Sequence, residues 1–239
     1  MLHAMPVADP TPPPETGRRD GLAYALFRAD DGPGGGVVIL HGAGSTKENH
    51  FDFARLCQAA GLDAVAFDQR GHGESGGALD GRAIEDVAAI AALLPAGPVA
   101  LRGSSMGGWL SLAAAHAAGA AGVVAICPAG SDLLREGLRG GRFEFTADRP
   151  SLDRLLATVD LQAAAGALGE RLLLLHAEGD EQVPAGHSRE LHAAAPGSRL
   201  EVVPGGHHRS VQHDEALQAL AVEFLVARCA AARNGRRGA

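Results

Sequence analysis

Cysteine is scarce in this chain of 239 residues, which contains only Cys57, Cys127 and Cys229. An odd number without metal-ligand spacing is the pattern of neither a disulfide framework nor a cysteine-rich metal site. Each cysteine lies in an apolar segment, where a free thiol behaves as a small buried hydrophobe. We therefore expect a reducing compartment, the cytoplasm, and no bound metal.

The sequence also lacks an excess of basic residues and a long apolar segment. Its 21 lysines and arginines are outnumbered by 28 aspartates and glutamates, for a formal net charge of −7. No stripe of positive charge is available for a phosphate backbone, and no segment predicts a membrane span or a targeting leader. The glycine run at 32–36 precedes a strand rather than opening a helix, so we expect no phosphate-bearing cofactor. The oligomeric state stays open.

The two ends of the chain differ in composition from the rest. Residues 1–20 are rich in proline and predict an extended arm, and residues 231–239 form a basic tail. Over the whole chain, 46% of the residues are hydrophobic and 21% are charged, as in globular proteins. We therefore expect one domain over residues 21–230.

Short apolar segments alternate with longer segments of helical spacing. The predicted strands are 36–42, 63–68, 98–103, 122–127, 171–177 and 198–204, with an edge strand near 22–28, and the clearest predicted helices are 50–61 and 80–95. Uninterrupted apolar strands are typical of a sheet that helices cover on both faces. The alternation predicts an α/β fold with a doubly wound, mostly parallel sheet.

One segment breaks the alternation, because residues 128–170 are more than a single crossover helix requires. We interpret residues 129–155 within it as a small lid insertion over the site. Its Phe143 and Phe145 are candidates for contact with substrate. A surface excursion without function is the alternative.

The motif "GSSMG" at 103–107 follows a predicted strand and precedes a predicted helix. A strand that turns directly into a helix strains the residue at the turn, and small residues two before and two after it avoid a collision. Ser105 is at the centre of this pattern and is our candidate nucleophile. Ser104 is then a bystander that points elsewhere.

A serine nucleophile needs a base, and the base needs an acid that orients it. Asp180 follows the predicted strand 171–177, and the pair His207 and His208 follows the next one. In parallel sheets these strand ends meet at the edge where ligands bind. Asp132, after an earlier strand, is the second candidate for the acid.

Two backbone N–H groups are candidates for stabilising an oxyanion. Ala43 follows the first parallel strand in "HGAGS", and Met106 follows the nucleophile at the start of a helix. His41 precedes the donor loop, and we assign it a structural role.

These motifs resemble the α/β-hydrolase superfamily, in particular its small serine esterases and its lysophospholipase-like and dienelactone-hydrolase-like branches. The segments "HGAGSTKE", "DQRGHGES", "GSSMGG", "EGDEQVP" and "PGGHHRS" stand in that superfamily's order. The resemblance implies a hydrolase fold over about residues 21–230, a structural turn at Asp68, Arg70 and His72, and His208 as the base, with two residues between it and the preceding proline–glycine pair.

The sequence thus predicts a cofactor-free serine hydrolase that acts on a small or medium carboxylic ester. Ser105, Asp180 and His208 form its expected triad, and Trp109, Phe143 and Phe145 are assigned to the substrate pocket. A thioesterase or small serine peptidase of the same fold is one alternative. A binding protein that keeps the fold without turnover is the other.

Overall fold

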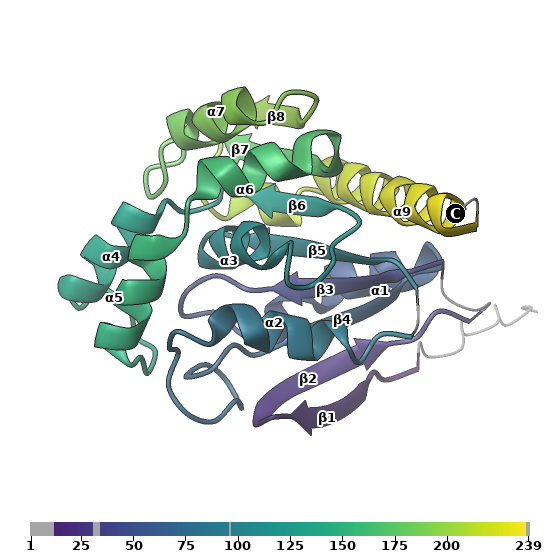
Figure 1. The fold of residues 1–239 in the computed structure, drawn as a ribbon, viewed down its shortest axis with the longest axis horizontal. Helices are drawn as coiled ribbons and strands as arrows, with labels where there is room; N and C mark the ends of the chain where they lie inside the picture. The colour runs from purple at the N-terminus through teal and green to yellow at the C-terminus, as the bar shows by residue number, and fades with distance from the viewer. Residues whose placement is uncertain (1–11, 31–33, 96, 238–239) are drawn as a thin grey trace, which may run out of the picture.

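An eight-stranded sheet forms the centre of the computed structural model, which describes residues 12–30, 34–95 and 97–237 (Figure 1). The strand order is β1-β2-β4-β3-β5-β6-β7-β8. Strands β3 to β8 run parallel to one another, whereas β2 is antiparallel to β1 and to β4. The strands are β1 Glu15–Arg19, β2 Leu22–Phe27, β3 Gly36–Leu40, β4 Asp63–Phe67, β5 Val99–Ser104, β6 Val123–Ile126, β7 Leu172–Ala177 and β8 Arg199–Val203. The predicted α/β architecture is confirmed.

Helices cover both faces of the sheet (Figure 1). On one face lie α2 Ala83–Ala91, α3 Met106–Ala114, α6 Leu161–Leu168 and α7 Ala185–Ala194, and on the other lie α1 Phe51–Ala59 and α9 Glu215–Arg237. The shorter elements are α8 Ser210–His213 and the 3₁₀ turns Lys47–His50 and Gly169–Arg171. Each face has its own apolar core, and strands β3 to β7 are buried throughout except at Val99, as their unbroken apolar sequences predict. Within the described ranges, no helix is both long and apolar enough to cross a membrane.

Two expected boundaries differ from the structure. The predicted arm contains β1, which pairs antiparallel with β2, so the sheet begins before residue 21. Backbone hydrogen bonds hold this strand, and its mostly exposed polar side chains gave no apolar pattern. The predicted basic tail continues α9 as far as Arg237. The rest of the arm (1–11) and of the tail (238–239) lies outside the described residues.

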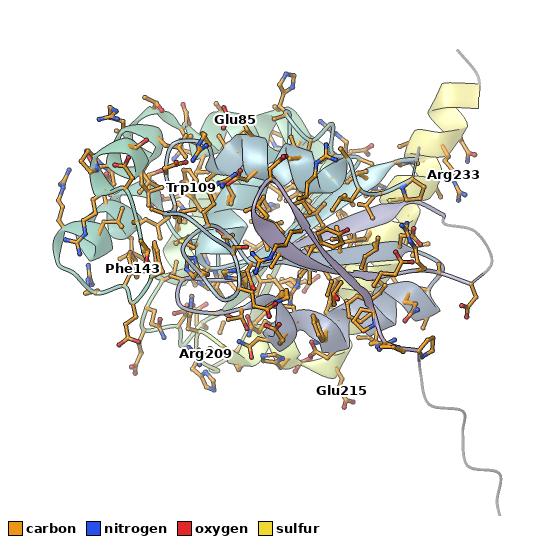
Figure 2. The ribbon with its side chains drawn as sticks, turned by 90° about the horizontal axis from the view of Figure 1, so that it is seen from below. Glu85, Trp109, Phe143, Arg209, Glu215 and Arg233 are labelled. Atoms are coloured by element: carbon orange, nitrogen blue, oxygen red, sulfur yellow. The ribbon has the colours of Figure 1, made fainter. Side chains whose placement is uncertain are left out.

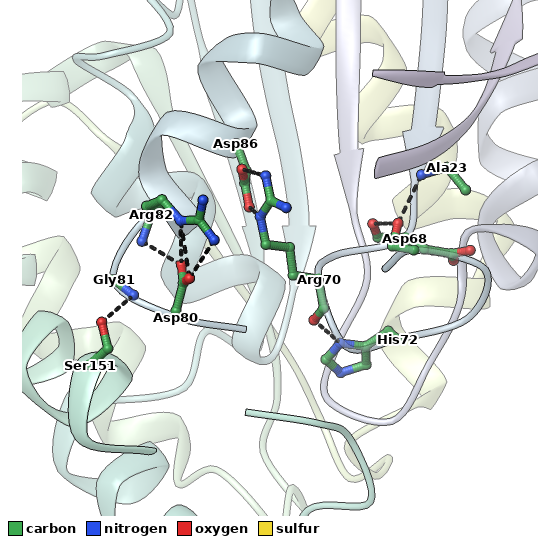
Figure 3. Close-up of polar contacts among 10 residues, drawn as sticks. Ala23, Asp68, Arg70, His72, Asp80, Gly81, Arg82, Asp86 and Ser151 are labelled. Carbon is green, nitrogen blue, oxygen red and sulfur yellow. Dashed lines mark hydrogen bonds and ion pairs between the residues drawn. The ribbon is translucent and has the colours of Figure 1, made fainter. Parts of the chain in front are cut away.

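The expected lid segment 129–155 contains α4 Ser131–Arg139 and most of α5 Arg149–Thr158. Both helices lie beyond the carboxyl ends of the parallel strands (Figure 1). The loop between them is bonded to the segment that follows β4: Leu79 N donates to Thr146 O at 2.9 Å, and Asp148 N donates to Leu79 O at 2.9 Å. Gly81 N donates to Ser151 Oγ at 3.0 Å (Figure 3). The segment is thus anchored to the sheet domain along one side.

Candidate active site

Ser105 occupies a strained turn between β5 and α3. Its φ of 55° and ψ of −118° are rare for a residue with a side chain. Gly103 and Gly107 are necessary here, since a Cβ at Gly103 would collide with the Gly107 carbonyl and one at Gly107 with the Leu40 carbonyl. This is the geometry that the motif predicts, and it presents Ser105 at the end of the sheet.

Ser105 lines a cavity of about 650 Å³ at the carboxyl ends of the strands. The same cavity is lined by Ala43, His208 and Phe143. Ser104, expected to point elsewhere, is 5% exposed and also contributes to this wall. The candidate nucleophile, Ser105, and the candidate base, His208, therefore line the same cavity.

The candidate base and the candidate acid, His208 and Asp180, are in contact at this cavity. His208 Nδ1 lies 2.7 Å from Asp180 Oδ2. The other carboxylate oxygen accepts hydrogen bonds from the N–H groups of Gln182 (2.8 Å) and Val183 (2.9 Å). Burial would raise the pKa of Asp180, but these N–H groups and His208 hold that pKa below its usual value. An ionised Asp180 fixes the proton of His208 on Nδ1 and leaves Nε2 as an acceptor.

The other candidates for acid and base lie apart from this pair. His207 is exposed, and its ring Nδ1 accepts from Arg209 N at 3.3 Å. Asp132 lies on α4 with a side chain that is 93% exposed, 3.6 Å from Arg135 Nη1. Among the described residues, no hydrogen bond joins Ser105 Oγ to His208, although both residues line the large cavity.

Two N–H groups near Ser105 are placed to donate to an oxyanion. The backbone hydrogen bonds of the described residues leave the N–H of Ala43 unused. The neighbouring Gly42 packs against the nucleophile, because a Cβ there would lie 3.3 Å from Ser105 Cβ. Met106 opens α3, where the first N–H groups of a helix lack internal partners and the helix dipole is positive.

The predicted pocket aromatics lie in a second, smaller cavity next to the first. This cavity of about 10 Å³ is enclosed by apolar side chains that include Trp109, Phe143 and Phe145. Phe143 lines both cavities and packs over Gly137 of α4. Trp109 is 2% exposed and donates its indole N–H to Ser131 Oγ at 2.9 Å. Figure 2 shows Trp109 and Phe143 at the end of the molecule opposite Arg233.

The turn after β4 is held by ion pairs. Asp68, fully buried, accepts from Lys47 Nζ at 2.9 Å and from Glu74 N at 2.9 Å. Arg70 makes a two-pronged contact with Asp86, with both distances at 2.7 Å (Figure 3). These are structural contacts of the kind that the resemblance implies for this turn.

Two histidines near the turn also make internal contacts. His72 stacks on Phe145 with ring centroids 4.2 Å apart, so it supports the aromatic cluster. Burial lowers the pKa of His41 to about 4, and this neutral ring accepts from Gln69 N at 3.0 Å. Neither ring lines the large cavity.

The sequence of residues 37–173 matches the model of the Alpha/beta hydrolase family. The chain belongs to this family. Several solved structures of low sequence identity share its fold. A monoacylglycerol lipase of Paleococcus ferrophilus superposes with a TM-score of 0.68 at 21% identity, over 87% of this chain and 99% of the lipase. An esterase of Pyrococcus furiosus gives 0.68 at 20% identity over 90% of each chain. Est1E of Butyrivibrio proteoclasticus, solved with ferulic acid bound, gives 0.63 at 17% identity over 89% of this chain and 96% of its own.

Two residues behind Asp180 of this alpha/beta hydrolase were not foreseen. His176 Nε2 lies 3.5 Å from Asp180 Oδ2 and 2.9 Å from the carbonyl oxygen of Val183. Cys127 follows β6 with a φ of 42°, is 1% exposed, and offers its Sγ to the same cluster. Both residues stand at carboxyl ends of neighbouring strands, which is the signal that singled out Asp180.

A buried arginine joins β5, which precedes Ser105, to the segment after His208 in this alpha/beta hydrolase. Arg102 of β5 is 0% exposed and donates to His50 Nδ1 at 2.8 Å and to Gln212 O at 3.3 Å. Its guanidinium also lies 4.6 Å from the centre of the Phe53 ring. Burial lowers the pKa of Arg102 to about 10 and that of His50 to about 2, so the arginine is charged and the histidine neutral near pH 7.

Proposed function

We propose that this chain is a serine hydrolase that cleaves a small or medium carboxylic ester through an acyl-enzyme, without a cofactor. One observation carries the proposal: His208, whose Nδ1 lies 2.7 Å from Asp180 Oδ2, lines the same cavity as Ser105 on its strained turn. The names of the lipase and the esterase among the similar folds support an ester as the substrate.

In this proposal the reaction begins with His208 in the tautomer whose Nε2 can accept a proton. Ser105 Oγ attacks the ester carbonyl carbon while its proton passes to Nε2 of His208, and the carbonyl oxygen becomes an oxyanion. The charged imidazole then gives this proton to the departing alcohol oxygen as the carbon–oxygen bond breaks. A water molecule repeats the sequence on the acyl-enzyme and releases the acid and free Ser105. Substrate binding completes the contact between nucleophile and base, since such hydrogen bonds are often long in free enzymes.

Asp180 and the backbone donors stabilise the charges that develop. The carboxylate holds the His208 tautomer and balances the imidazolium ion. The N–H groups of Ala43 and Met106 donate to the oxyanion, and removal of one such donor in other enzymes costs about 10²–10³ in kcat. Because both donors belong to the backbone, side-chain substitution tests them poorly.

In this proposal the acyl group lies in the large cavity that Ser105 lines, next to the small apolar cavity. The small cavity's wall of Trp109, Phe143 and Phe145 offers no charged group to a substrate. With a volume of about 10 Å³ the small cavity is nearly filled, so a longer acyl chain enters it only if lining side chains such as Phe143, which faces both cavities, move. The proposal therefore favours small or medium acyl groups while residues 129–155 stay in place as a lid.

A fluorophosphonate probe followed by peptide mapping tests the proposal before any substrate is known. We expect labelling of Ser105, no labelling of Ser105→Ala, and near-normal labelling of Ser104→Ala as the matched control. A labelled Ser104 or an unlabelled wild type would contradict the proposal. A series of ester, thioester and amide substrates with one shared acyl group then separates an esterase from a thioesterase or peptidase by kcat/KM.

A further inference from the structure

Behind the catalytic pair lies a buried cluster with the donor set of a transition-metal site. Cys127 Sγ, an imidazole nitrogen of His176 and a carboxylate oxygen of Asp180 all lie within 4.8 Å of one another, and all three residues are buried. Tetrahedral zinc with nitrogen and oxygen ligands at about 2.0–2.2 Å places those ligands roughly 3.3–3.6 Å apart. The separation between His176 Nε2 and Asp180 Oδ2 is 3.5 Å. We propose that Cys127, His176 and Asp180 bind a thiophilic divalent cation such as Zn²⁺, and that this binding switches the hydrolase off.

Protons and charges balance when the cation enters. Burial raises the pKa of Cys127 to about 12, so the free site holds a neutral thiol. On binding, the metal–sulfur bond forms and the thiol proton leaves to solvent. The 2+ charge is then met by one thiolate and one carboxylate, which leaves the buried site neutral, as a low-dielectric interior requires.

His176 has the outer partner that a metal-bound imidazole needs. Its Nδ1 lies 2.6 Å from Ser188 Oγ, and its Nε2 lies 2.9 Å from Val183 O. When Nε2 turns to the cation, its hydrogen bond to Val183 O breaks, and the ring proton moves to Nδ1, which donates it to Ser188 Oγ. Such outer-shell contacts fix the tautomer and orientation of ligating histidines.

The remaining cluster of possible ligands in the described part of the chain contrasts with this one. Glu48, Asp68 and Glu74 surround the ammonium group of Lys47, which contacts all three carboxylates. A cation is already supplied there by the protein. Within the described ranges, Asp180 contacts no lysine or arginine, and its polar partners include the two histidines and two backbone N–H groups.

Metal binding affects catalysis through Asp180, and this part of the inference rests on the proposed function. Oδ2 of Asp180 is the atom that pairs with His208 Nδ1 and that lies nearest to His176. A cation on this oxygen withdraws the negative charge that holds the His208 tautomer. Gln182, Val183 and His208 line the large cavity, so opening of the turn after Asp180 gives the cation its path.

Cobalt binding tests the site independently of activity, because a cobalt–thiolate bond produces a charge-transfer absorption in the near ultraviolet. We expect the full-length protein to develop this band with one Co²⁺ per chain. Cys127→Ser should abolish the band, and Cys57→Ser, a matched buried cysteine, should keep it. Ser188→Ala should weaken binding by about 10–100-fold through the imidazole. A missing wild-type band, or one that persists in Cys127→Ser, overturns the site.

Zinc inhibition tests the coupling to catalysis. Stoichiometric Zn²⁺ should suppress ester hydrolysis by the wild type, and a chelator should restore it. The rate of Cys127→Ser, relative to its own metal-free rate, should be insensitive to the same Zn²⁺ concentration. Cobalt absorption without zinc inhibition would overturn the switch. A protein without any ester hydrolysis would overturn the proposed function, and the absorption would still decide the metal site.

Discussion

The two ends of the candidate triad are held in different ways. The turn at Ser105 is fixed by backbone sterics, since Gly103 and Gly107 leave no room for even a Cβ. The loop that carries His208 is exposed from residue 204 to residue 207, and a Cβ at Gly205 would meet nothing within 4 Å. Here a single side-chain contact, to Asp180, sets the imidazole. The candidate nucleophile is therefore positioned by packing and the candidate base by hydrogen bonding.

This contrast separates stability from turnover. Substitutions around Ser105 should damage the fold itself, because the turn lies between buried strands and α3. Substitution of His208 should leave the fold intact and remove activity. Arg102 is the link between the two, since it belongs to the strand of Ser105 and bonds to Gln212 beyond His208.

The largest effect is expected at His208. His208→Ala should lower kcat by on the order of 10⁶, as loss of the base does in a well-studied triad, with the circular dichroism spectrum unchanged. His207→Ala is the matched control and should reduce activity only modestly, because its ring contacts the loop and not Asp180. The reverse ranking in folded variants would assign the base to His207.

Asp180→Asn should lower kcat by on the order of 10⁴, because the amide favours the wrong tautomer of His208. The measurement is steady-state hydrolysis of an activated ester near pH 7. Asp132→Asn is the control, with an exposed side chain, and should retain nearly full activity. Near-normal turnover in Asp180→Asn together with a loss in Asp132→Asn would place the acid on α4.

The packing half of the comparison can be tested with two glycines. Gly107→Ala should destabilise the fold by about 3 kcal/mol or more, since its Cβ meets the carbonyls of Leu40 and His41. Gly205→Ala should cost only about 1–2 kcal/mol, for its positive φ of 65°. Urea unfolding measures both, and a larger loss at Gly205 would refute the contrast.

A smaller, pH-dependent effect is expected at His50, the partner of Arg102. Burial lowers the pKa of His50 to about 2, against about 6.5 in an unfolded chain. Between these values the unfolded state binds the extra proton, so stability falls as the pH drops below about 6.5. This one group should cost about 2 kcal/mol between pH 8 and pH 5.

His50→Gln keeps an acceptor for Arg102 and should remove that share of the pH dependence. Urea unfolding at the two pH values provides the measurement, with the exposed His116→Gln as the control. If the free energy of unfolding of His50→Gln changed with pH as much as that of the wild type, the His50 ring would have to take up its proton in the folded state as well.

The parallel strands were predictable from sequence because burial on both faces leaves an unbroken apolar pattern. The position of Ser105 was predictable because the tight turn requires residues without a Cβ two positions before and two positions after it, and Gly103 and Gly107 stand there. β1 was not predictable, since its residues are mostly exposed and the partner strand supplies its stability. Propensity alone also gave no sign that α9 would extend through the basic residues to Arg237.

The surroundings of Asp180 were harder to foresee than Asp180 itself. Cys127 and His176 were each part of an apolar run, where a single polar residue predicts nothing about its neighbours. Their proximity depends on the order of β6 and β7 in the sheet, which sequence alternation leaves undetermined. The contacts of Arg102 were equally hard to foresee, because it is a charged residue inside a strand that is buried on both faces.

The two outermost strands have a consequence for association between molecules. β1 and β8 end the sheet on either side, and each would offer unpaired backbone groups to a strand of another chain. β1 carries Glu15, Arg18 and Arg19, and β8 carries Arg199 and Glu201. A second copy aligned along either edge would have to desolvate these charges, so the sheet resists growth into an edge-to-edge aggregate by its own side chains.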